Sequence, residues 1–85
     1  MKSIVKKSDQ NYQTDNLQLA SYLLAKGINL FKVERSGHLG IFFFSAKEVM
    51  PEVERFSSGR ALIEPRSYSR AFRELRFRVD QVQDE

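Results

Sequence analysis

Arginines in the last third of the chain are the side chains best suited to bind a partner. Four of them are Arg66, Arg70, Arg73 and Arg76, and Arg60 lies just upstream. Arg66, Arg70 and Arg73 are spaced i, i+4, i+7, which places them on one stripe of a helix. Each guanidinium group can make forked hydrogen bonds to a phosphate or a carboxylate. This spacing predicts a surface that follows the phosphates of DNA or RNA.

A second interpretation of the arginines requires no ligand. An amphipathic helix has a polar outer face in contact with water, and these arginines are suited to it. The carboxylates that could pair with them are Glu74, Glu48, Glu52 and Glu54. Acidic residues at Asp80, Asp84 and Glu85 also reduce the positive charge toward the C-terminal end. The sequence leaves both interpretations open.

The remaining polar residues form no catalytic or metal-binding pattern. His38 is the only histidine, and it falls in a predicted turn without a second ligand at a suitable spacing. The sequence contains no cysteine, which excludes disulfides and thiolate metal sites. It also lacks a glycine-rich phosphate loop and a nucleophile elbow. We therefore expect a protein that is not an enzyme, with no cofactor and no metal, and with His38 exposed.

The composition is that of one small globular domain with a modest basic charge. Of the 85 residues, 41% are apolar and 29% are charged, which argues against overall disorder. The net charge of +3 permits an anionic partner without requiring one. No apolar run is long enough to span a membrane, and the first residues lack the apolar core of a signal peptide. We expect a cytoplasmic protein without a membrane partner.

A sheet built around residues 39–45 is expected to position the arginine stripe. This segment is rich in aromatic residues, as strands are. Its apolar side chains fall on both faces, with Leu39, Ile41 and Phe43 on one and Phe42 and Phe44 on the other. Such a strand is expected in the middle of a sheet, with both faces covered. It superficially resembles the aromatic strand of RNA-recognition motifs, but Leu39 and Ile41 replace the base-stacking rings. We interpret it as a core strand.

The segments before this strand predict a strand, a helix and a second strand. Residues 11–13 are compatible with a very short strand. The run 16–26 has a wide apolar face, which predicts a helix that packs deeply. Gly27 stands where a left-handed C-terminal cap is needed. Residues 28–35 are expected to pair with the Phe-rich strand through a hairpin in which Gly37 takes a positive φ.

The segments after the Phe-rich strand predict two more helices. A capping box at residues 45–48 opens the first of them, and Pro51 implies either a kink or a start near Met50. Residues 60–64 have room for one brief strand. Pro65 is suited to the first turn of a final helix that runs to about residue 83.

The predicted fold class is α+β. We expect a small antiparallel sheet with a central Phe-rich hairpin strand, two packing helices and a basic amphipathic helix at the C-terminal end. This order is compatible with a ferredoxin-like βαββαβ sheet plus a helix. The predicted organisation is a flexible basic lead-in over residues 1–10, one domain over 11–83, and an acidic tail over 84–85.

The apolar stripe of the final helix should fix how the arginines are held. Its members are Tyr68, Phe72, Leu75, Val79 and Val82. We expect Tyr68 to Leu75 to pack within the monomer, and Val79 and Val82 to run past the core as a frayed end or an interface. Phe72→Ala should then cost about 3–5 kcal/mol, as for a buried aromatic residue.

Several segments together resemble a known family. Residues 14–27 (TDNLxLAxxLLxKG) are followed by the Phe-rich strand, Ser58-Gly59, the apolar run 61–63 and a Pro-started helix over 65–78. Over roughly residues 12–80 this pattern resembles a family of short bacterial and mobile-element proteins catalogued only as a domain of unknown function. The resemblance implies a compact α+β domain from a phage, plasmid or integrated element, and it implies no known site.

Two hypotheses for the function follow. The first is a small non-enzymatic binding module of a phage or mobile element that contacts nucleic acid through the Arg-rich helix. The alternative is a protein–protein interaction or inhibitor module that acts on a host factor or associates with itself, because Tyr22, Phe31 and Phe77 cannot all be buried by the predicted stripes. A positive face free of aromatic residues would favour nucleic acid, and a mixed aromatic and arginine patch would favour protein. The oligomeric state, monomer or homodimer, stays open.

Overall fold

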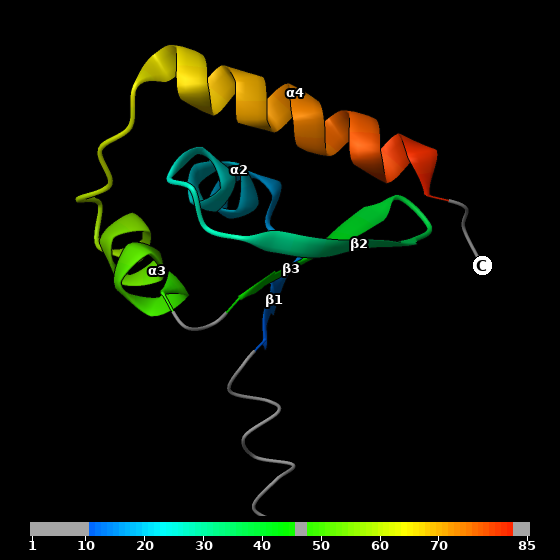
Figure 1. Cartoon of the computed structure of the whole chain (residues 1–85), viewed down its shortest axis with the longest axis horizontal. Coiled ribbons are helices and arrows are strands. Elements are labelled where there is room, and N and C mark those ends of the chain that lie inside the picture. Colours follow the sequence, from blue (N-terminus) through cyan, green and yellow to red (C-terminus); the bar gives the residue numbers. More distant parts are fainter. Residues whose placement is uncertain (1–10, 46–47, 83–85) are drawn as a thin grey trace, which may run out of the picture.

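The computed structural model describes residues 11–45 and 48–82 (Figure 1). The elements in chain order are β1 (Asn11–Thr14), α2 (Leu17–Ala25), β2 (Leu30–Ser36), β3 (Leu39–Ser45), α3 (Val49–Ser57) and α4 (Pro65–Gln81). The described part therefore has a three-stranded antiparallel sheet and three helices, which confirms the α+β class. The lead-in predicted for residues 1–10 and the tail predicted for 84–85 lie outside the described residues.

Strand β3, which carries Phe42, Phe43 and Phe44, lies between the other two strands in the order β1-β3-β2. Both pairings are antiparallel, with Tyr12 of β1 and Leu30 of β2 each opposite Phe44. The β2–β3 hairpin turns at Gly37, whose φ of +61° favours glycine. The expectation for this turn is confirmed, and so is the left-handed Gly27 after α2, with φ +90°.

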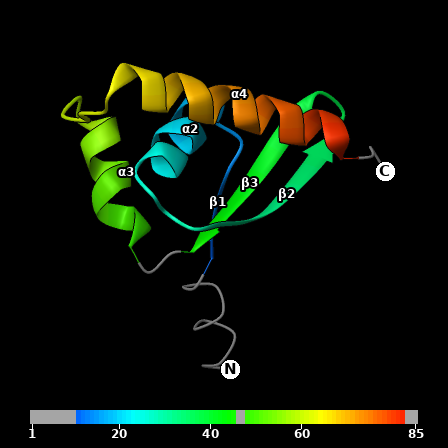
Figure 2. The same ribbon diagram turned by 45° about the horizontal axis from the view of Figure 1, so that its top comes forward.

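Helices cover one face of the sheet. Phe42 and Phe44 point to this face and are 1% and 0% exposed, beneath α2 and α4, which lie on the same side of the sheet (Figures 1 and 2). On the opposite face Ile41 and Phe43 are only half-buried, and Leu39 is exposed. The expectation that both faces of the strand are covered is therefore wrong, because no described helix packs on the second face.

Helix α2 lies at the centre of the hydrophobic core. Leu19, Ala20, Tyr22 and Leu23 are all buried, which confirms the wide apolar face expected for this segment. The helix begins after Asn16, whose side chain accepts a hydrogen bond from the Leu19 amide at 3.1 Å and so satisfies one of the free amides of the first turn. Both α3 and α4 pack against α2 (Figure 2).

Helix α3 begins at Val49, which is fully buried. Pro51 therefore sits in the first turn, where proline is tolerated because the amide it lacks has no helical partner; this agrees with the predicted start near Met50. The predicted capping box is not formed, since Ser45 ends β3 and the helix cap is Glu48, without a side-chain hydrogen bond.

The strand predicted at residues 60–64 is absent. This segment connects α3 to α4, with Ala61 and Ile63 packed against the core and Leu62 80% exposed. Because the fourth strand of a βαββαβ sheet is missing from the described residues, the ferredoxin-like assignment is not confirmed.

Helix α4 crosses α2 and ends over the β2–β3 hairpin (Figures 1 and 2). Ala71 and Leu75 are its buried residues, whereas Phe72 is only half-buried. The cost expected for Phe72→Ala should therefore be lower than for a fully buried ring. Val79 packs against the core next to Gly40, so the expectation that the C-terminal half of this helix runs past the core is also wrong.

Candidate nucleic-acid interface

Local signals and the core together fix the orientation of α4. Glu64 caps the helix: its side chain accepts hydrogen bonds from the Ser67 amide at 2.9 Å and from the Ser67 hydroxyl at 3.1 Å. These bonds hold the pKa of Glu64 below its usual value, because they favour the charged carboxylate. Pro65 occupies the first turn. With Ala71 and Leu75 buried against the core, the opposite side of the helix must face solvent.

Arg66, Arg70 and Arg73 lie on that outer side, and all three are exposed. Together with Pro65 and Ser69 they line a shallow depression of about 350 Å³. From Arg66 to Arg73 the stripe extends about 10 Å along the helix axis, at about 1.5 Å per residue. The structure thus brings three of the five predicted contact residues together on one surface, which we call the arginine stripe.

No carboxylate forms an ion pair with the arginine stripe within the described residues, but Glu64 lies near enough to Arg70 for the guanidinium group to help lower the pKa of its carboxyl group. The ion pairs there are Lys32–Glu34 and Arg55–Glu52, each at 2.8 Å. Glu52, one of the acids considered as a partner of the arginines, is occupied by Arg55 and by the Tyr22 hydroxyl. Apart from this attraction between Glu64 and Arg70, the described residues show no pairing of the stripe with carboxylates, and its three guanidinium groups are exposed to solvent.

Phe77 follows the arginine stripe on the same line of the helix. Its position continues the i, i+4, i+7 series of Arg66, Arg70 and Arg73 to i+11, and its side chain is 60% exposed. The outer face is therefore free of aromatic residues along its first two turns, which favours nucleic acid by the criterion given above, and mixed beyond them, which by the same criterion favours a protein partner. Of the other aromatic residues expected to escape burial, Phe31 is 46% exposed, whereas Tyr22 is buried.

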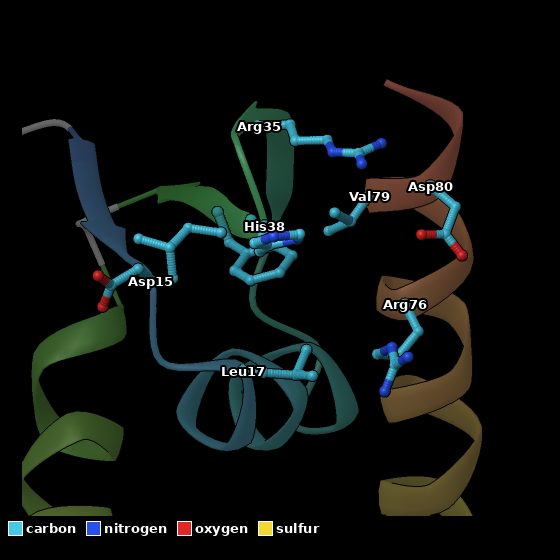
Figure 3. Close-up of a pocket in the computed structure, with 10 residues that line it drawn as sticks. Asp15, Leu17, Arg35, His38, Arg76, Val79 and Asp80 are labelled. Carbon is cyan, nitrogen blue, oxygen red and sulfur yellow. The ribbon is translucent and has the colours of Figure 1, made fainter. Parts of the chain in front are cut away.

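Arg76 belongs to a different surface, a pocket of about 380 Å³ between α4, the β2–β3 hairpin and the segment that leads into α2 (Figure 3). Arg35 and His38 line the same pocket, and so do Asp15 and Asp80. Its mixed charge could accommodate a small polar group, but the two carboxylates offset the cations. His38 is exposed, as expected from its place in the turn.

Arg35 lines this pocket and was not anticipated from the sequence. Its guanidinium donates hydrogen bonds to the Gly37 carbonyl at 3.0 Å and the Val82 carbonyl at 3.4 Å. The bond to Val82 ties the hairpin to the end of α4, whereas the bond to Gly37 lies within the hairpin. A single arginine in a strand carries no local signal that it will reach a helix 47 residues later in the chain.

Arg60 stands apart from the other predicted contact residues. It lies in the connection between α3 and α4 and is exposed, and it lines neither the depression at the arginine stripe nor the pocket beside Arg76. Its backbone amide donates to the Arg55 carbonyl at 2.8 Å. Of the five predicted contact residues, three therefore form the arginine stripe. Arg76 lies at the pocket, and Arg60 lies on neither surface.

The titratable groups with shifted pKa values have structural explanations. Burial, followed by the hydrogen bond to Glu52, raises the pKa of Tyr22 to about 12, and the same bond holds the pKa of Glu52 below its usual value. The hydroxyl–carboxylate distance is 2.6 Å. Both residues belong to the contact between α2 and α3, away from the arginine stripe. Across residues 11–45 and 48–82, no three His, Cys, Asp or Glu side chains gather in a way that could hold a metal ion.

The fold and this surface define a small α+β domain that presents a basic helix. The chain belongs to the family described as a domain of unknown function, DUF5659, whose sequence model matches residues 9–79. Membership in a family of unknown function, indicated by the sequence pattern, is thereby confirmed. Neither the curated proteins nor the solved structures include a match. In the described part of the chain, no helix combines the length and apolar character needed to cross a bilayer.

Proposed function

We propose that this protein is a small non-enzymatic module that binds nucleic acid through the arginine stripe. The observation that carries the proposal is the shared exposure of Arg66, Arg70 and Arg73 on one depression, with no ion pair to a carboxylate among the described residues. Guanidinium groups in this arrangement can each contact a phosphate and release its condensed counterions. The phage or mobile-element setting implied by the family resemblance is part of this proposal.

The way α4 is anchored supports a contact surface of fixed shape. Leu75 is fully buried, Val79 lies beside Gly40, and Arg35 holds the Val82 carbonyl. Both halves of the helix are therefore attached to the core. The backbone positions of the arginines are thus fixed relative to one another before binding, so no helix has to be ordered on association.

A protein–protein interaction is the second candidate, and the open face of the sheet favours it. Leu39 is 52% exposed and Phe31 46% exposed, with Phe31 against the half-buried Phe43 at a ring distance of 6.3 Å. An apolar face of this kind is suited to a host factor or to a second copy of the chain. The helices α2 and α4 lie on the other side of the sheet (Figure 1), over Phe42 and Phe44, so the face that carries Phe43 and the arginine stripe could both be used.

The proposal is tested by fluorescence anisotropy with labelled DNA and RNA of mixed sequence, single-stranded and duplex. We expect binding at low salt that weakens as the salt is raised from about 50 mM to about 200 mM. The variant R70A/R73A should bind all probes more weakly, and its slope of log K against log salt on duplex DNA should be shallower by roughly 1.8.

The control is the variant K32A/R55A, which removes the same number of positive charges from residues that pair with carboxylates elsewhere. It should keep the wild-type slope. Equal losses in the two double variants would show that net charge alone is responsible, and absence of salt-dependent binding by the wild type would overturn the proposal. A self-associated protein that binds no nucleic acid would favour the second candidate.

A further inference from the structure

Phe77 has no structural explanation in the described fold. It is 60% exposed and lies on the outer side of α4, opposite the buried Ala71 and Leu75. Phe31, the other exposed phenylalanine in the described part of the chain, packs against Phe43. Phe77 has no ring contact or cation–π contact with any described residue. Its ring is therefore available to a partner.

The surroundings of Phe77 are basic. Arg73 precedes it by four residues, about 6 Å along the helix axis, and Arg70 and Arg66 continue the same line. Arg76 is adjacent in sequence and exposed. An apolar ring at the end of a row of cations suits a ligand that is both anionic and aromatic. It suits a peptide that is only acidic or only aliphatic less well, because such a peptide would cover either the cations or the ring but not both.

We infer that the ligand of this surface is single-stranded nucleic acid, with its phosphates along the arginine stripe and an unpaired base stacked on Phe77. The inference rests on the proposed function and specifies its substrate class. In a duplex the base faces are stacked on one another, and an exposed ring reaches them only by forcing a base step open. In a single strand the faces are free, and stacking on an aromatic side chain tolerates any base.

A tryptophan at position 77 offers a direct readout, because the chain contains no tryptophan. The fluorescence of Phe77→Trp should be quenched when an unlabelled single strand is added, and it should be unaffected by the matching duplex. The control is Met50→Trp, at an exposed site on α3 with a comparable exposure of 55%. Its fluorescence should not change with either ligand. Quenching at both positions, or at neither, would overturn the inference.

Affinity gives the second readout. Phe77→Ala should lower the affinity for single strands about tenfold and leave the affinity for duplex unchanged, while Phe77→Tyr should retain wild-type affinity for both. Phe31→Ala tests whether the open sheet face is the stacking surface instead: it should have no effect on binding. DNA and RNA strands of identical sequence show whether the sugar matters to the same surface.

The outcomes separate this inference from the proposed function. If the wild type binds neither form of nucleic acid, the proposed function and this inference both fall, and Phe77 would then belong to a protein interface. If the wild type binds both forms and Phe77→Ala weakens neither, or weakens both equally, the single-strand inference falls and the proposed function stands. A loss confined to Phe31→Ala would place the stacking surface on the sheet and overturn the role of Phe77.

Discussion

Val79 of α4 lies directly over Gly40 of β3. A Cβ atom built on Gly40 would come within 2.5 Å of Val79 Cγ2 and 3.0 Å of the Phe42 ring. The hairpin and the end of the helix can approach this closely only because residue 40 has no side chain. This contact holds the C-terminal half of α4 against the sheet, and it therefore sets the direction in which the arginine stripe faces.

Gly40→Ala should destabilise the protein by about 1–3 kcal/mol, as overpacking does in a well-packed core. The helix must shift or Val79 must leave its position. Val79→Ala removes both atoms that the new methyl group would meet on that side chain, so the double variant should recover part of the loss. Chemical denaturation of the four proteins gives the coupling energy, which should be about 1 kcal/mol or more and favourable. Additive effects would show that the two elements do not meet here.

Leu75→Ala should be the most damaging truncation on α4. Leu75 is fully buried, so its loss is expected to cost about 2–5 kcal/mol, a large fraction of the stability of a domain of this size. Phe72→Ala should cost less, because Phe72 is half-buried and its ring contact is with the neighbouring Tyr68 at 6.2 Å. Thermal melts of the two variants test this order. A Phe72→Ala variant less stable than Leu75→Ala would contradict it.

The local features of this fold could be predicted where one residue type dictates the backbone. Gly27 and Gly37 have positive φ, and Pro65 begins a helix, as their chemistry requires. The spacing of the apolar residues in α2 also predicted a helix correctly, because most of that helix is buried. The line shared by Arg66, Arg70 and Arg73 followed from helix geometry alone.

What could not be predicted depends on contacts between distant segments. A short apolar run such as 61–63 indicates a strand only if a sheet edge is available to it. In the structure Ala61 and Ile63 pack against the core without pairing to a strand, and Leu62 is exposed. The coverage of the Phe-rich strand depends on where the helices lie. Gly40 did carry a usable signal, since a glycine inside a strand often marks a close approach, but its partner Val79 is 39 residues away.

Burial of the Tyr22 hydroxyl, together with its hydrogen bond to Glu52, should make the stability depend on alkaline pH. The pKa of Tyr22 is raised from 10.0 to about 12 in the folded protein, so between these values the folded state holds a proton that the unfolded state has lost. The stabilisation is complete below about pH 10 and is lost as the pH rises toward 12. Its size is about 1–3 kcal/mol.

Melting curves of the wild type and Tyr22→Phe across pH 9 to 12 test this expectation, in the range around the raised pKa of Tyr22. The difference between the two proteins should shrink with rising pH, because Tyr22→Phe has no hydroxyl to ionise at this position. Glu52→Gln provides the control: it removes the neighbouring charge but keeps an acceptor, so the alkaline loss should be smaller than in the wild type. Parallel curves for wild type and Tyr22→Phe would contradict the coupling.

The division of the arginines between surfaces leads to a prediction for each one separately. Arg66, Arg70 and Arg73 line the same depression, so each single alanine variant should reduce the salt slope by a similar amount, about 0.9 on duplex DNA or 0.7 on single strands. Arg60 lies outside that depression, in the connection between α3 and α4, so Arg60→Ala should leave the slope unchanged. All four side chains are exposed, so the removal of any one of them should alter the free energy of unfolding by less than about 0.5 kcal/mol. Melting curves of each variant check this before the binding measurements are compared. The four variants carry the same net charge, so a general charge effect would lower all four salt slopes equally. Binding through the arginine stripe would instead lower the slopes of the three stripe variants and leave that of Arg60→Ala unchanged. A slope for Arg60→Ala as shallow as that of Arg70→Ala would show that phosphates are not confined to the outer face of α4.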